Sequence, residues 1–508
     1  MKKHLLIFLS ATAIFFSSAI TGFACEISEA ASQLAKPGFK DIISAFTASP
    51  SAITAGVIFV FAMILAAVFG KRISTRLEST TAKSMTSVFI IFFSAFGIAA
   101  LAMGFATEGE TWSNLMNQES SGGFPMSQFE DYILNVKYAG RQHFYLAAEK
   151  NSPFSLLMFY LLAQFLPPQY IYSDSFVDSI KILRNQTFMF MYLIMVLCIV
   201  FMIYKMARYV LRKNSLNIRD ELISFLLVVS YPAIFCIEKG NFSAISLMLS
   251  ILFILCHKSE KKIARELSLV ALAVSAAITP FTIVFAILLL IDTTDRKEAL
   301  ISFAKPVGYF IALFIIPAIF TGFGNAFTFI KAFLNVDADG FITGNMSIVN
   351  LLHFFGITNS VIVFAVFILT EAIAILAMFV LPSMWQKIAA ATYVMLNIFS
   401  VSNTVSAIFI FIPLIFLLAE KKHSAKDWVY MFTFAFIVTP FPEWFRYDAA
   451  NFNAFLATMN VSVNNANDLI ALAALQFLMV VMLSQTISVF KKNKALKTAP
   501  AKSEESAA

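Results

Sequence analysis

The sequence predicts an all-α polytopic membrane protein, and three observations lead to this fold class. Of its 508 residues, 59% are hydrophobic and only 13% are charged, and the mean hydropathy is +0.80. A soluble protein carries about twice that charged fraction. The apolar residues form runs of bilayer length, and lysines and arginines cluster between the runs. We therefore expect about 11–13 transmembrane helices, with extracytoplasmic loops that carry the functional site.

Charge placement argues against a nucleic-acid-binding protein, and cysteine content argues against a metal-binding or disulfide-stabilised one. The formal net charge is +7, but the basic residues lie between apolar runs. Because they are not interleaved with aromatic residues, no nucleic-acid partner is predicted. None of the four cysteines forms a close pair, which argues against a metal site or a disulfide framework. They are Cys25, Cys198, Cys236 and Cys256. The lipid bilayer is the first partner that the composition predicts.

The chain begins with two lysines, an apolar run and Thr-Gly-Phe-Ala, which is a signal-peptide pattern. Residues 1–24 are either a cleaved signal peptide or an uncleaved signal anchor. The spans 52–70 and 85–105 then enclose a basic cytoplasmic loop. The segment 106–185 is therefore the first large extracytoplasmic loop. Within it, Pro153 to Leu166 is apolar but too short to cross, so we expect a helix that lies in the outer interface or dips into it.

The remaining spans follow from the basic clusters, which mark the cytoplasmic side. Residues 267–291 have basic residues at both ends and Thr279-Pro280 in the middle, which indicates two short helices, although a simple kink would give the same pattern. A second extracytoplasmic loop covers 324–358, and 491–508 form a Lys-rich cytoplasmic tail after a membrane domain of residues 25–490. The further predicted spans are 187–204, 222–237, 242–256, 306–322, 361–381, 388–401, 404–419, 428–441 and 469–490.

Two polar groups outside the spans are candidates for chemistry. Glu130 and Asp131 are adjacent, so their side chains point in different directions, and one can face a site while the other is solvated. The alternative is that both are solvated. The run Glu238-Lys239-Gly240-Asn241 places charges in a tight turn between two spans, which is costly without a partner or ligand. Lys239 suits a phosphate, although the run could equally be a capped turn at the headgroup layer.

Glu371 lies in the middle of the span 361–381, where a carboxylate needs a partner or a proton. A helix–helix hydrogen bond and proton coupling are the two interpretations, and the first is the more ordinary.

Four sequence blocks together resemble the GT-C superfamily of membrane glycosyltransferases. The resemblance is nearest to the family-87-like, polyprenol-phosphate-sugar-dependent branch, which is mannosyltransferase-like. Coverage is roughly residues 85–420, and the order and spacing of the blocks carry it. The blocks are Phe129-Glu130-Asp131-Tyr132 with Asn135, Lys137-Tyr138 and Asn151-Ser152-Pro153-Phe154; Tyr231 to Asn241; Ala276-Ala277-Ile278-Thr279-Pro280; and Asn345 to Leu352.

The resemblance implies a GT-C-like bundle and an inverting transfer of a hexose such as mannose, or of a pentose, from a polyprenyl-phosphate donor. The acceptor would be an envelope glycan, lipid or protein. Asp131 would be the catalytic base with Glu130 as fallback, and no metal or other cofactor is required. The implied donor-binding residues are Lys239, Asn241, Arg141, Glu238, Tyr138 and Asn345.

Two departures keep other functions open. Thr279 stands where the family often has lysine, and Ser406-Ala407 stand where many members have His-Tyr. A transporter or flippase of lipid-linked glycans, and a non-catalytic envelope scaffold of the same fold, are therefore the rival hypotheses. The composition and the signal-like start suggest a bacterial inner (plasma) membrane with the site facing the periplasm, although an endoplasmic reticulum location would have the same topology.

Overall fold

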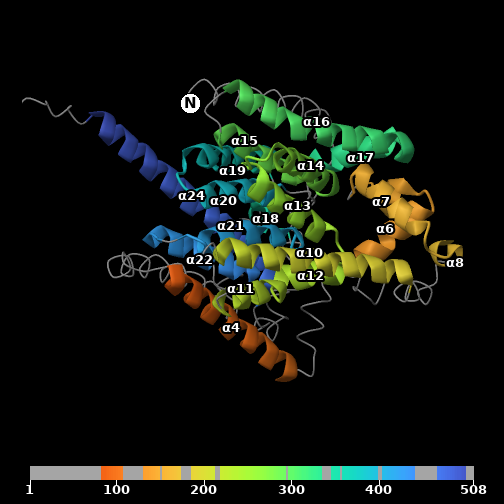
Figure 1. Cartoon of the computed structure of the whole chain (residues 1–508), viewed down its shortest axis with the longest axis horizontal. Helices are drawn as coiled ribbons and strands as arrows, with labels where there is room; N and C mark the ends of the chain where they lie inside the picture. The colour runs from red at the N-terminus through yellow and green to blue at the C-terminus, as the bar shows by residue number, and fades with distance from the viewer. Residues whose placement is uncertain are drawn as a thin grey trace, which may run out of the picture.

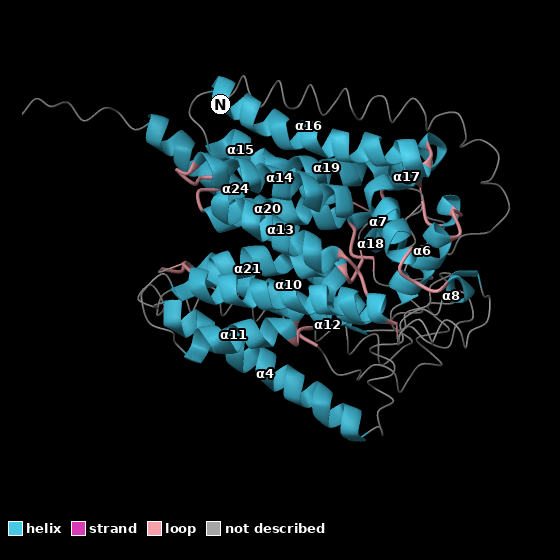
Figure 2. Ribbon diagram, turned by 45° about the vertical axis from the view of Figure 1, so that its right-hand side comes forward, coloured by secondary structure: helices cyan, strands magenta, loops and turns pink. Residues whose placement is uncertain are grey.

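A computed structural model describes residues 82–106, 130–148, 151–172, 185–211, 218–292, 296–334, 345–354, 357, 359–398, 403–420, 422–440 and 466–498. Within these ranges 86% of residues are helical and no strand occurs, which confirms the predicted all-α class (Figure 2). The predicted signal segment, the span 52–70 and residues 107–129 lie outside the described residues.

Within the described residues, four helices are long and apolar enough to cross a bilayer, and each overlaps a predicted span. The membrane-length stretches are Gln186–Val210, Lys297–Thr321, Ser360–Val380 and Ile470–Lys491. They belong to α10 (Gln186–Leu211), α16 (Arg296–Thr321), α19 (Ser360–Val380) and α24 (Ala466–Thr498). The chain is thus an α-helical membrane protein, while the total of about 11–13 crossings stays a prediction.

The predicted span 222–237 is broken into two helices, α11 (Ile218–Val228) and α12 (Tyr231–Lys239), bent by 44°. Pro232 lies in the first turn of α12, where its missing N–H costs nothing. The Ser230 hydroxyl donates to the Leu227 carbonyl at 2.7 Å and so occupies one of the carbonyls left free where α11 ends.

Two other boundaries also differ from prediction. α16 begins at Arg296, ten residues before the predicted start, and it continues through Pro306 and Pro317. Proline is tolerated inside membrane helices because neighbouring groups can satisfy the carbonyls that it leaves free. In the last turn of α16 the Thr321 hydroxyl also donates to the Pro317 carbonyl. α24 continues to Thr498, so the predicted tail is helical over its first residues.

The break at Thr279-Pro280 is confirmed. α14 (Lys262–Ile278) ends there, and a 3-10 segment, η2 (Pro280–Ala286), leads into α15 (Ile287–Asp292). α14 and η2 contact each other, as expected where the chain turns back. The last carbonyls of α14 accept hydrogen bonds from another part of the chain: Ser152 donates to Ala277, and Ser155 donates to Ile278 at 3.3 Å.

One large apolar core includes Trp385, Phe409, Phe411, Tyr430 and Phe434. Further helices that pack around it are α4 (Ala82–Ala106), α13 (Ser243–Cys256), α20 (Met384–Asn397), η3 (Ser406–Ile410), α21 (Phe411–Leu418) and α22 (Ala425–Val438) (Figure 1). α18 (Ile348–Phe354) packs on α19 in a small separate cluster, and α17 (Phe323–Leu334) contacts α16.

Glu371 on α19 takes part in a buried hydrogen-bond network that joins three helices. Asn397 on α20 donates from Nδ2 to Glu371 at 2.7 Å and to Thr370 at 3.2 Å. Gln476 on α24 donates to the carbonyl of Met346 at 2.7 Å. The prediction of a helix–helix hydrogen bond at Glu371 is confirmed, and the bond satisfies a carboxylate that lipid could not solvate.

Short helices from the first predicted loop form a group at one end of the bundle, which we call the end subdomain (Figures 1 and 2). It contains α6 (Glu130–Gly140), η1 (Phe144–Leu146), α7 (Pro153–Ala163) and α8 (Pro168–Tyr172). α7 has 11 residues, too few to cross a bilayer, as its sequence predicts. Its place in the outer interface stays a prediction.

Candidate functional site

The structure brings together two of the predicted site residues that lie 110 positions apart. The Asn241 side chain donates from Nδ2 to the Oδ2 atom of Asp131 at 3.1 Å. Asp131 lies in the first turn of α6, and Asn241 lies between α12 and α13. A carboxylate in the first turn of a helix complements the helix dipole.

Local chemistry determines the orientation of Asn241. Its Oδ1 atom accepts from the backbone N–H of Ser243 at 2.9 Å and from the Ser243 hydroxyl at 2.7 Å, which caps the start of α13. With the oxygen occupied in this way, the amide nitrogen faces Asp131. Gly240 makes the turn before it with φ +66°, a conformation that glycine adopts without the steric cost of a Cβ.

A cluster of aromatic side chains holds α6 against the turn between α12 and α13. Phe242 stacks on Phe159 of α7 with ring centroids 4.8 Å apart, and Tyr132 contacts Phe159 and Phe188 of α10 at 6.5 and 5.9 Å. Tyr132 and Phe242 are the chain neighbours of Asp131 and Asn241. Burying these aromatic side chains therefore places the carboxylate opposite the amide.

Tyr132 is fully buried, and within the described part of the chain its hydroxyl has no hydrogen-bond partner. Burial raises the pKa of the Tyr132 phenol above its usual range, because the charged phenolate would lose its hydration. Tyr132 is a neutral structural residue beside the site, and Asp131 is the group that can accept a proton.

Lys239 and Glu238 end α12 immediately before this turn, and both are buried, with 7% and 6% of their surfaces exposed. The Lys239 ammonium lies 5.5 Å from the centroid of the Phe235 ring, a cation–π contact. A cation in the last turn of a helix also complements the helix dipole. The site thus combines a carboxylate, an amide and a lysine two residues from that amide.

Other predicted residues lie elsewhere. Arg141 directly follows α6, ten positions after Asp131 and a rise of about 15 Å away. It donates from Nε to the Ile171 carbonyl of α8 at 2.6 Å. Tyr138, two turns beyond Asp131, packs near Ala148. Glu130 begins α6, but its side chain lies outside the described residues.

Asn345 bonds Ser347 much as Asn241 bonds Ser243, and the Ser347 hydroxyl in turn caps α18 by accepting from the Asn350 N–H at 3.2 Å. The Oδ1 atom of Asn345 accepts from the Ser347 N–H at 3.0 Å and from the Ser347 hydroxyl at 2.7 Å. Its backbone carbonyl accepts from Asn350 at 2.7 Å. The carbonyl of the next residue, Met346, accepts a hydrogen bond from α24, and the Ile348 N–H donates to Asn397 of α20. These contacts anchor the Asn345 turn in the bundle core.

Sequence reasoning missed Ser243 and the aromatic neighbours of the site. An Asn-x-Ser pattern directly before an apolar run is a helix-start signal and could have identified Ser243. The two departures from the family pattern are both buried turn residues: Thr279 precedes η2, and Ser406 donates from its backbone and its hydroxyl to Asn403, each at 2.8 Å.

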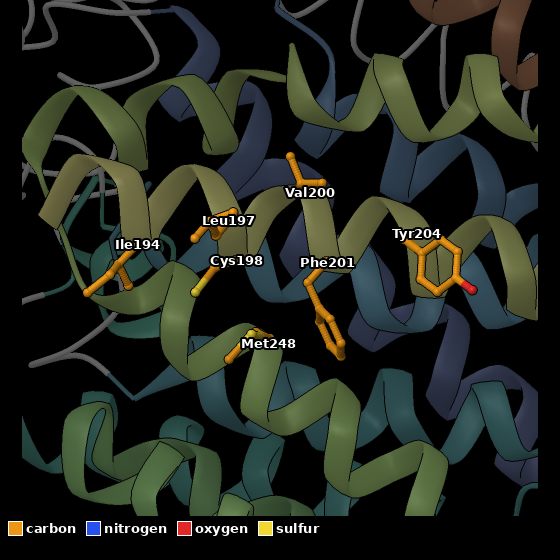
Figure 3. Close-up of a pocket in the computed structure, with 7 residues that line it drawn as sticks. All are labelled: Ile194, Leu197, Cys198, Val200, Phe201, Tyr204 and Met248. Atoms are coloured by element: carbon orange, nitrogen blue, oxygen red, sulfur yellow. The ribbon is translucent and has the colours of Figure 1, made fainter. Parts of the chain in front are cut away.

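An apolar groove of about 530 Å³ runs between α10 and α13 (Figure 3). The side chains of Ile194, Cys198 and Phe201 on α10 face Met248 on α13. Both helices have their first residues near the Asp131–Asn241 pair, because Phe188 on α10 contacts Tyr132 and Asn241 caps α13. Leu197, Val200 and Tyr204 complete the lining.

The residues that the structure describes contain no group of three or more His, Cys, Asp or Glu side chains that could hold a metal ion. Comparison of the chain with family models, curated proteins and solved structures gives no match. The resemblance to membrane glycosyltransferases therefore depends on the sequence blocks alone.

Proposed function

We propose that the chain is a membrane glycosyltransferase that moves a sugar from a polyprenyl-phosphate donor to an acceptor on the extracytoplasmic face. The observation that carries the proposal is the 3.1 Å bond between Asn241 and Asp131, with Lys239 two residues away. Both sides of this contact come from blocks that resemble the family. Their meeting supports a common site.

In this proposal Asp131 accepts the proton of the acceptor hydroxyl as that oxygen attacks the anomeric carbon. The carbon–oxygen bond to the phosphate breaks with inversion, and the lipid phosphate leaves with its negative charge. A positioned general base typically contributes about 10²–10⁴-fold to the rate. Asn241 holds the carboxylate in place, and the Lys239 ammonium stabilises the leaving phosphate.

The apolar groove between α10 and α13 suits the lipid part of such a donor. Starting from Ile194, its lining side chains continue for about 15 Å along α10 to Tyr204. The sugar-phosphate would occupy the polar end beside Asn241, and the hydrocarbon chain would follow the groove into the bilayer.

The test is transfer from a radiolabelled panel of polyprenyl-phosphate sugars in membranes that contain wild type, Asp131→Asn or Glu130→Gln. We expect Asp131→Asn to lower transfer at least about 100-fold and Glu130→Gln to keep most of it. Unchanged transfer in Asp131→Asn would remove the base from this position. Absence of product with every donor, from folded protein, would favour the flippase or scaffold hypothesis.

A further inference from the structure

The helix α17 follows the membrane span of α16 at a sharp turn. Gly322 joins them with φ +97°, a backbone conformation that a residue with a Cβ adopts only with strain. α17 has 12 residues and is about 18 Å long, well short of a bilayer core of about 30 Å. The helix therefore cannot cross the membrane by itself.

α17 has three faces of different character, as its 100° rotation per residue shows. Ala326 and Phe329 are buried, and the Phe329 ring lies 6.0 Å from that of Phe314 on α16. About 90° from that face, an exposed stripe contains Phe323, Phe327 and Ile330, which are 52%, 69% and 39% exposed. About 100° further round lie Thr328 and Lys331.

These faces suit three different surroundings. One face packs on protein, one large apolar stripe has no protein cover within the described residues, and the third is polar. The exposed stripe continues the lipid-facing surface of α16, where Ile315, Ile319 and Phe320 are also exposed. A helix that lies flat at the membrane surface, beside the bundle, has protein, lipid and water on these sides.

We propose that α17 is a membrane-surface helix whose stripe of Phe323, Phe327 and Ile330 is seated in the headgroup–acyl boundary of the lipid bilayer. α17 also contacts η1, which follows α6 and exposes Tyr145 and Leu146. Lipid contact along α17 thereby supports the end subdomain and sets the height of Asp131 above the bilayer. This inference does not depend on the proposed transfer reaction.

The test uses nitroxide labels on the full chain in phosphatidylcholine vesicles. Single cysteines replace Phe323, Phe327 or Ile330 in a background in which serine replaces the four native cysteines, Cys25, Cys198, Cys236 and Cys256. Matched controls label Thr328 on the polar face and Ile315 on α16. Collision rates with oxygen, which dissolves in lipid, and with a nickel chelate, which dissolves in water, report the surroundings of each label.

We expect the three stripe labels to collide with oxygen several-fold more, relative to nickel, than the label at 328. Their depths should agree within about 3 Å, whereas an upright helix would separate positions 323 and 330 by about 10 Å. If the stripe labels collided preferentially with nickel, the stripe would lie in water and the proposal would be overturned. Low collision rates with both reagents would overturn it by showing a protein cover, such as a second copy of this chain.

Discussion

Replacing Asn241 by Asp isolates the contact between the two halves of the candidate site. The new side chain has nearly the same shape and keeps an oxygen that can accept from Ser243. It loses the amide hydrogen that now bonds Asp131 at 3.1 Å, so two carboxylates face each other. We expect Asn241→Asp to destabilise the docking of α6 against the α12–α13 turn.

The magnitude follows from two terms. A hydrogen bond to a charged acceptor contributes about 1.5–3 kcal/mol. Repulsion between unit charges 3.1 Å apart is about 1 kcal/mol in water and about 5 kcal/mol at an effective dielectric constant of 20. Because Asp131 and Asn241 are half-buried, we expect a net loss of about 2–4 kcal/mol at neutral pH.

The assay is unfolding of the detergent-solubilised protein, followed by the change in fluorescence, with Asn403→Asp as the matched control. Asn403 likewise accepts from the N–H and hydroxyl of a serine, Ser406, which lies three residues on instead of two, and its side chain is exposed. Asn403→Asp should therefore cost less than about 1 kcal/mol. Near pH 4 one shared proton can bridge the two carboxylates of Asn241→Asp, and the loss should shrink.

If Asn241→Asp were as stable as Asn403→Asp at pH 7, Asp131 would not face this turn. A loss that stays constant between pH 7 and pH 4 would show that charge repulsion is not its cause.

Three further predictions concern other parts of the fold. Ser152→Ala removes the hydroxyl that caps α7 and bonds Ala277, so hydrogen exchange in α6 and α7 should become faster, by about 1–2 kcal/mol of local stability. Glu371→Leu leaves the Asn397 amide without its carboxylate and should cost about 2–4 kcal/mol in unfolding, whereas Glu371→Gln keeps an acceptor and should cost less. Burial lowers the pKa of His423 to about 4 from 6.5, so its unfolded form binds more protons between those pH values, and about 3 kcal/mol of stability should be lost as pH falls through that range.

For each of these three predictions, either a control variant or a result that would contradict it can be stated. Gln164→Ala removes an exposed hydrogen bond to Tyr160 near the end of α7 and should leave exchange unchanged. Equal losses in Glu371→Leu and Glu371→Gln would show that the Asn397 bond is not what stabilises the buried carboxylate. In His423→Gln the free energy of unfolding should fall less steeply as the pH decreases. A fall identical to that of wild type would show that other groups cause the loss of stability.

Part of this structure follows from local rules that the sequence displays. Apolar runs of bilayer length predict α10, α19 and α24 because water cannot solvate such segments. Thr279-Pro280 predicts the end of α14, since proline has no N–H to donate and clashes with the preceding turn. Gly240 predicts the tight turn between α12 and α13, where its φ of +66° suits a glycine.

The same local rules misplace features that depend on what lies beside a helix. Pro306 and Pro317 do not end α16, although the sequence predicts that the span begins at Pro306. Ser230-Tyr231-Pro232 does break a run that reads as one continuous span. The local signals at the three prolines are alike, and the outcome differs because proline is tolerated within a membrane helix where neighbouring groups satisfy the carbonyl it leaves free.

The sequence by itself determines that this is an α-helical membrane protein and where several of its helices and turns lie, because hydropathy, capping and turn formation act within a few residues of each position. Tertiary structure alone decides that Asp131 meets Asn241 and that Arg141 bonds the Ile171 carbonyl at the far end of α6. These partners depend on how Tyr132, Phe159, Phe188 and Phe242 pack together across α6, α7, α10 and the start of α13. Such packing is a property of the assembled core, and no local pattern in the chain contains it.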